Sequence, residues 1–271
     1  MSKRKRILLT LSSVVAMICA YGWFFGIATA MVLEARYFGW KAPVLKKTPV
    51  EIADSSISLT PVRKLAFSGY EFEVPWEVDD EKTKVVGKME VIAFRSGNAM
   101  LVSNQASKEF VNLVLKSGLD RDSFQKIYGK EALQSDYAMH QLMLQSTPDK
   151  VTLFTPRGEA VSRLMMLVMK GIAIPAPADT GLFSIRSQEF RGFQYGDPQK
   201  RPARIIVDLL GDDGGIEFNM GQKKDGSGPA VTQAELNRLI QSTRRVPVQL
   251  SGTEREERPP QKAVATTALR N

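Results

Sequence analysis

Ser123 and Lys126 have the S-x-x-K spacing, in which a lysine amine lies one helical turn from a nucleophilic hydroxyl. Serine-lysine enzymes of this type carry two further motifs, and here both are misplaced. Ser135 and Asp136 follow the serine too closely, and a K-S-G triplet at 116–118 precedes it instead of following it. So short a pattern arises by chance, and an envelope serine-lysine hydrolase is kept only as an alternative function.

The chain holds one histidine and one cysteine, which limits nucleophilic and metal chemistry. His140 shares a predicted helical face with Leu133, Tyr137 and Leu144, so the sequence favours a buried histidine over a general base. Cys19 lies in a long apolar segment, where a thiol is not an accessible nucleophile. A zinc site would have one imidazole and otherwise carboxylates. We therefore predict no catalytic residue, no metal site and no cofactor.

Asp212, Asp213 and Glu217 form an acidic group in and after the segment 211–215. Aspartate and glycine at these positions are typical of a hairpin turn. Turn formation is therefore favoured over calcium binding or glycosidase chemistry.

Methionine is concentrated on two predicted helices, at Met139, Met143, Met165 and Met169. Flexible thioethers suit either irregular core packing or an adaptable apolar groove. Core packing is the favoured interpretation, and the four side chains are retained as the candidate lining of an apolar groove.

Residues 7–33 contain no charged side chain, a run of 27 that exceeds the roughly 20 residues needed to cross a bilayer as a helix. Four basic residues at 3–6 precede it, which predicts a cytoplasmic N-terminal segment over 1–6. We predict that 7–33 is an uncleaved transmembrane signal anchor. Residues 28–30 also form an A-x-A cleavage pattern, so cleavage after Ala30 stays open.

The anchor implies a single-pass protein of a bacterial inner membrane, with its C-terminal part in the periplasm or otherwise outside the cytoplasm. The net charge of +8 falls to +4 when residues 3–6 are set aside, and no basic stripe remains to bind nucleic acid. A proline-containing segment at 34–55 is predicted as a tether, and 251–271 as a disordered tail. The extracytoplasmic domain is therefore placed at 56–250.

Within this domain the hydrophobic pattern changes from strands to helices and back. Segments at 70–74, 85–94 and 99–102 predict antiparallel strands, and helical periodicity over 110–117, 122–129, 133–144 and 156–171 predicts a helical block. Strands return between 182 and 220, and Thr232 with Glu235 predicts a capping box for a closing helix. The fold class is α+β: an N-terminal transmembrane helix, then a mostly antiparallel sheet with an inserted helical block and a closing helix.

The segment Gly69–Trp76, an aromatic strand ending in Pro75 and Trp76, resembles the opening of Mog1/PsbP-like α/β sandwich domains. The helix at 232–243 is similar in place to the closing helix of that family. The helical block at 107–174 departs from the family pattern. The resemblance implies a non-catalytic role beside a larger assembly.

These observations predict a membrane-anchored, extracytoplasmic, non-catalytic binding or assembly module with a protein partner in the envelope. A carrier or sensor of an apolar ligand, using the methionine-lined helices, is an alternative. A wide pocket between the helical block and the sheet would favour the carrier, whereas a tight core with an exposed apolar patch would favour the module.

Overall fold

A computed structural model describes residues 26–37, 48–52, 63–116, 119–174, 181–200, 204–212, 214–221 and 230–246. The predicted segment 1–6, the anchor up to residue 25 and the tail at 251–271 lie outside these ranges. Residues 26–37 form a helix. In the part of the chain that the structure describes, no helix is long and apolar enough to cross a membrane.

The described strands form two sheets that pack against each other. The larger has eight strands in the order β1 (Val50–Glu51), β7 (Leu182–Arg186), β8 (Arg191–Tyr195), β9 (Arg204–Gly211), β10 (Gly214–Gly221), β6 (Ala99–Gln105), β5 (Met89–Ala93) and β4 (Lys84–Val86). The smaller has the order β11 (Arg244–Arg245), β3 (Tyr70–Val74) and β2 (Arg63–Phe67). Only β1 and β7 pair in parallel among these strands, so the predicted mostly antiparallel sheet is confirmed.

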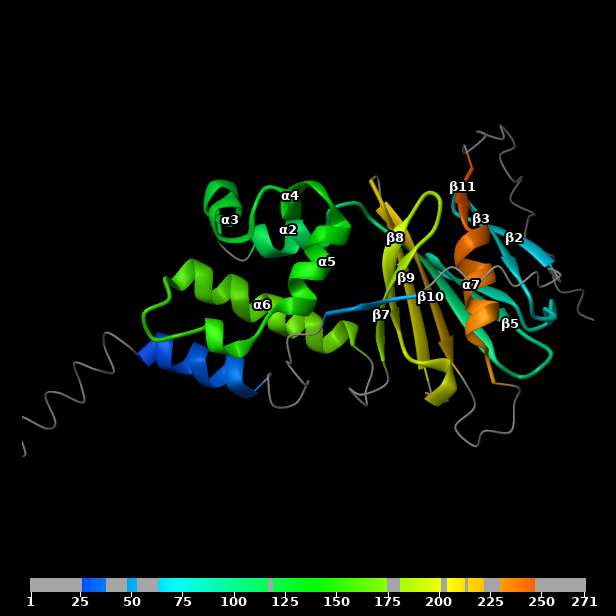
Figure 1. Ribbon diagram of the computed structural model, residues 1–271, viewed down its shortest axis with the longest axis horizontal. Coiled ribbons are helices and arrows are strands. Elements are labelled where there is room, and N and C mark those ends of the chain that lie inside the picture. The colour runs from blue at the N-terminus through cyan, green and yellow to red at the C-terminus, as the bar shows by residue number, and fades with distance from the viewer. Residues whose placement is uncertain are drawn as a thin grey trace, which may run out of the picture.

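Helices cover both faces of the large sheet (Figure 1). On one face lies the helical lobe, which consists of α2 (Glu109–Lys116), α3 (Arg121–Tyr128), α4 (Glu131–Gln134), α5 (Asp136–Gln145), the 3₁₀ turn η1 (Pro148–Lys150) and α6 (Arg157–Ala173). On the other face lie the small sheet and α7 (Gln233–Ser242). A second 3₁₀ turn, η2 (Pro198–Lys200), links β8 to β9. The helical block inserted between strands is therefore confirmed, as is the closing helix.

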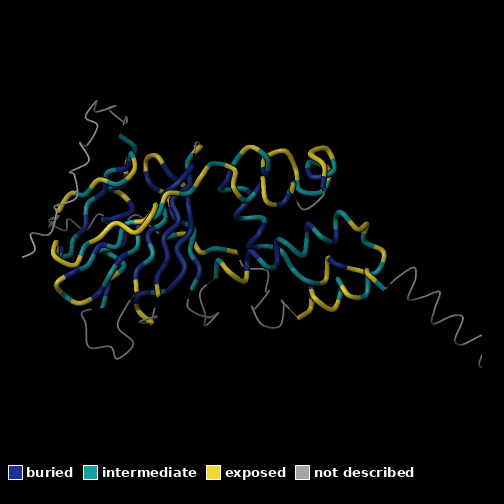
Figure 2. The backbone as a smooth tube through the Cα atoms, turned by 180° about the vertical axis from the view of Figure 1, so that it is seen from behind, coloured by how far each residue is buried: buried dark blue, intermediate teal, exposed yellow. Residues whose placement is uncertain are grey.

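Strand β9 shows how one segment serves both faces. Ile205, Val207 and Leu209 pack in the cluster with α7 and the small sheet, whereas Ile206 and Leu210 pack against the helical lobe. Side chains of a strand alternate between the faces, so a strand covered on both sides is apolar almost throughout. Figure 2 shows the resulting concentration of buried backbone in the central strands.

Residues before the predicted domain also contact it. Ala35 is buried in a cluster with Val151, Ala160 and Leu167, which places the helix over 26–37 against the helical lobe (Figure 1). Strand β1 lies in the segment predicted as a tether and pairs with β7. The ends of the predicted anchor and tether therefore pack on the domain they were expected to hold at a distance.

Candidate functional site

Ser123 lies in the first turn of helix α3. Its hydroxyl donates to Asp120 Oδ2 at 2.7 Å, and its backbone N–H donates to Asp120 Oδ1 at 2.9 Å. Asp120 is thus the N-cap of α3, and these hydrogen bonds lower its pKa. The hydroxyl has a capping partner and Lys126 is exposed, so the geometry supports the structural interpretation of this pair.

The candidate groove methionines pack in the helical lobe. Met139, Met143 and Met169 are buried in the cluster between the lobe and the sheet, and Met165 is half-buried against it. None of the four methionines lines the cavity that lies between α2, α5 and the large sheet. Their packing favours the core interpretation over an apolar groove.

His140 on α5 is the buried histidine that the sequence favours, with 2% of its surface exposed. Its ring meets the Phe110 ring edge-on at 4.3 Å and stacks at 6.3 Å from Phe193. Nδ1 lies 2.9 Å from the Asp136 carbonyl oxygen, which can only accept, so Nδ1 carries the proton. Burial lowers the pKa of His140, opposed by the Asp136 carbonyl and carboxylate, and the ring is neutral. Nε2 is then an acceptor, without a partner among the described residues.

His140 lines a cavity of about 260 Å³ between the helical lobe and the large sheet. Helices α2 and α5 form one wall, and β6, β9 and β10 form the other. The lining residues are Ser103, Asn104, Gln105, Ala106, Glu109, Phe110, Leu113, Asp136, His140, Leu210, Gly215 and Glu217. The cavity therefore combines an apolar part with a cluster of polar groups.

Two of the lining carboxylates are held in place by neighbouring groups. Both oxygens of Asp136 accept from the Lys108 N–H at 3.0 Å, and Lys108 has a left-handed backbone with φ 58°. A left-handed conformation is unfavourable for lysine, so the carboxylate stabilises this turn at the start of α2. Glu217 accepts from Gln105 Nε2 at 3.4 Å and from Asn219 Nδ2 at 3.3 Å.

A polar layer continues behind the cavity into the sheet. Asp208 lies opposite Glu217 in the β9–β10 register and accepts from Gln105 Nε2 at 3.3 Å. Burial, followed by the Glu217 charge, raises the pKa of Asp208 well above its usual range. Burial and the same two carboxylates raise the pKa of the Tyr195 hydroxyl.

Asp208 and Tyr195 were not expected from the sequence to belong to a site. The available signal was one acidic residue inside the apolar run 205–210. Asp212 lies in the β9–β10 turn, where Gly214 has φ 105°, so the turn prediction is confirmed there, and Asp213 lies outside the described residues. Glu217, grouped by sequence with these turn residues, instead lies beside Asp208 at the cavity.

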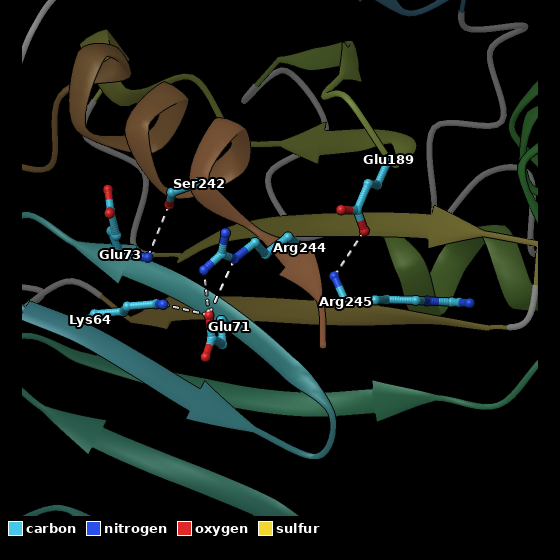
Figure 3. A network of polar contacts seen from close by, with 7 residues as sticks. All are labelled: Lys64, Glu71, Glu73, Glu189, Ser242, Arg244 and Arg245. Atoms are coloured by element: carbon cyan, nitrogen blue, oxygen red, sulfur yellow. Dashed lines mark hydrogen bonds and ion pairs between the residues drawn. The ribbon is translucent and has the colours of Figure 1, made fainter. Parts of the chain in front are cut away.

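A second polar network joins the small sheet to α7 (Figure 3). Lys64 and Arg244 contact Glu71 at 2.5 and 2.8 Å, and their hydrogen bonds, followed by their charges, lower the pKa of that carboxyl. Ser242 Oγ accepts from the Glu73 N–H at 2.9 Å, and Glu189 accepts from the Arg245 N–H at 2.8 Å. Each of these groups has a protein partner, so we assign the network to the attachment of β11 and α7.

No family model, curated protein or solved structure matches the chain. Within the described ranges, no group of three or more histidine, cysteine, aspartate or glutamate side chains is placed to hold a metal ion.

Proposed function

We propose that this protein is a non-catalytic binding protein that holds a small ligand in the cavity between the helical lobe and the large sheet. The observation that carries the proposal is His140, a 2%-exposed imidazole that lines the cavity with Nε2 unpartnered among the described residues. Ligand pockets combine apolar walls with a few polar groups that fix the orientation of the ligand, and this imidazole supplies one acceptor at the cavity.

The cavity lies between the helical lobe and the sheet, where a carrier or sensor of an apolar ligand was expected to have its pocket. Its lining residues differ from the expected ones. The expected groove was apolar and lined by methionines, whereas three carboxylates and an imidazole line the cavity. A ligand with polar groups fits this lining better than a purely apolar one, because an apolar ligand would displace water from the carboxylates and from His140 Nε2 without replacing its hydrogen bonds.

We further propose that residues 7–33 anchor the protein in a bacterial inner membrane and that the folded domain lies outside the cytoplasm. The support is the uncharged run of 27 residues with four basic residues before it. An assembly role with an envelope protein is the second candidate. It is favoured by Val85, Val86 and Met89, which are exposed at the β4 edge of the large sheet.

The experiment is ligand-detected NMR on the detergent-solubilised full chain with a mixture of small polar fragments. Ser103 lines the cavity, so Ser103→Leu should fill it and abolish the saturation transfer seen with the native protein. Asn112→Leu, exposed on α2 and outside the cavity lining, is the control and should leave the transfer unchanged. Equal transfer in the native chain and Ser103→Leu, or none in either, would overturn the proposal.

A further inference from the structure

We infer that the cavity selects a small organic cation, an ammonium or amidinium group attached to a compact apolar body. This inference rests on the proposed function and adds the chemical class of the ligand.

The charge of the lining has a single sign. Glu109, Asp136 and Glu217 contribute three carboxylates, and no lysine or arginine is among the residues that line the cavity. Like charges gathered in a partly enclosed space raise one another's energy, because the surrounding protein screens them less than water does. A ligand cation would relieve this repulsion, whereas an anion would add to it.

Among the charged and aromatic polar groups of the lining, hydrogen-bond acceptors predominate, and Ser103 adds a hydroxyl that can donate or accept. His140 offers Nε2 as an acceptor, and the carboxylates can only accept when they are ionised. Gln105 Nε2 donates to Asp208 and to Glu217, and Asn104 Nδ2 donates one of its two N–H groups to Ser68 Oγ at 3.4 Å. A ligand that brings N–H donors, as an ammonium or amidinium group does, matches the carboxylates and His140 Nε2.

The apolar lining residues and the volume of the cavity determine which body can carry the cationic group. Phe110, Leu113 and Leu210 give the cavity an apolar portion, and a volume of about 260 Å³ suits a compact body instead of a long chain. Metal ions fit less well, because the described carboxylates and His140 are not grouped closely enough to share one ion.

Three probes of one shape test the charge directly: benzamidine, benzamide and benzoate. Titration calorimetry of the detergent-solubilised full chain near neutral pH should show benzamidine binding at least about tenfold more tightly than benzamide. Benzoate should bind more weakly than both. Equal affinities for benzamidine and benzamide, or stronger binding of benzoate, would overturn the inference.

Two variants assign the selectivity to the cavity. Glu217→Gln should weaken benzamidine by about tenfold and change benzamide little, because it removes charge and keeps shape. Glu109→Gln, at the exposed rim, should give a smaller loss with little risk to the fold. Glu189→Gln, in the network of Figure 3, is the control and should change neither affinity.

The two proposals fail in different ways. If benzamidine has no advantage but polar fragments still lose contact in Ser103→Leu, the cation class is wrong and the binding site stands. If benzamidine binds with the same affinity to native protein and Ser103→Leu, the site itself is wrong.

Discussion

Gly192 in β8 should be the position in the large sheet that is least tolerant of a methyl group. It pairs with Leu209 of β9, next to the buried Asp208. A Cβ atom at Gly192 would overlap the Asp208 carbonyl oxygen and lie 2.8 Å from the Asp208 carbonyl carbon, where ordinary contacts are 3.4–4 Å. The obstacle is backbone, which cannot rotate away as a side chain can. Gly192→Ala should therefore separate β8 from β9.

The cost combines two effects. Overpacking a buried site costs about 1 to 3 kcal/mol, and each ladder hydrogen bond that is lost costs about 1 kcal/mol more. With one or two bonds stretched, Gly192→Ala should lower the free energy of unfolding by about 2 to 5 kcal/mol. That is a large share of the roughly 5 to 15 kcal/mol of a typical domain.

Urea unfolding of the full chain in mild detergent, followed by tryptophan fluorescence, measures this change. Gly221→Ala is the control, because a Cβ atom there meets nothing within 4 Å. This substitution should be neutral or stabilising by up to about 1 kcal/mol. A Gly192→Ala protein within about 0.5 kcal/mol of the native one would refute the reasoning about the β8–β9 contact.

Three further predictions concern the core, the polar layer and the anchor. Met166→Lys should abolish cooperative melting by circular dichroism, because Met166 is fully buried, whereas Met165→Lys should melt at a lower temperature but stay folded, because Met165 is half-buried. Asp208→Asn should be more stable than the native chain at neutral pH in urea titrations. The raised pKa of Asp208 means that the folded state keeps the Asp208 proton to a higher pH than the unfolded chain does. The free energy of unfolding of the native chain therefore falls as pH rises above 3.8, the pKa of an unperturbed aspartate. The stability advantage of Asp208→Asn should accordingly disappear near pH 3.8. Protease added to intact spheroplasts should digest the folded domain, and digestion only after lysis would contradict the proposed orientation.

Features that depend on local sequence could be predicted. The capping box of α7 is present as expected, because Thr232 and Glu235 bond within one turn of chain. The boundary between β4 and β5 was missed, since 85–94 reads as one apolar strand. Gly87, with φ 62°, reverses the chain there and makes a hairpin. Helix α3 begins after Asp120 instead of at the predicted residue 122, because Asp120 accepts the capping hydrogen bonds.

The site could be predicted only in fragments. His140 was expected to be buried on a helix, but its position at a cavity depends on α5 packing against the large sheet. Asp208 and Glu217 lie nine residues apart in sequence, and the β9–β10 register places them opposite each other. Gln105 joins them because β6 pairs with the other side of β10. Pairing of this kind is set by the hydrophobic faces of whole strands, which residue spacing alone does not reveal.

We expect the buried carboxyl groups of the polar layer to lower the free energy of unfolding, and this expectation distinguishes a binding role of Glu217 from a structural one. Asp208 and Glu217 are directly opposed carboxyl groups in a covered sheet, where burial and the Glu217 charge raise the pKa of Asp208 and so disfavour two charges at once. Glu217→Gln keeps the side-chain shape and can still accept from Asn219, so we expect it to unfold at a higher urea concentration than the native chain. The same variant should bind benzamidine more weakly. Gain of stability with loss of binding is the result expected of a site that holds unfavourable charge for its ligand. A Glu217→Gln protein that is less stable would instead assign Glu217 to the support of the fold.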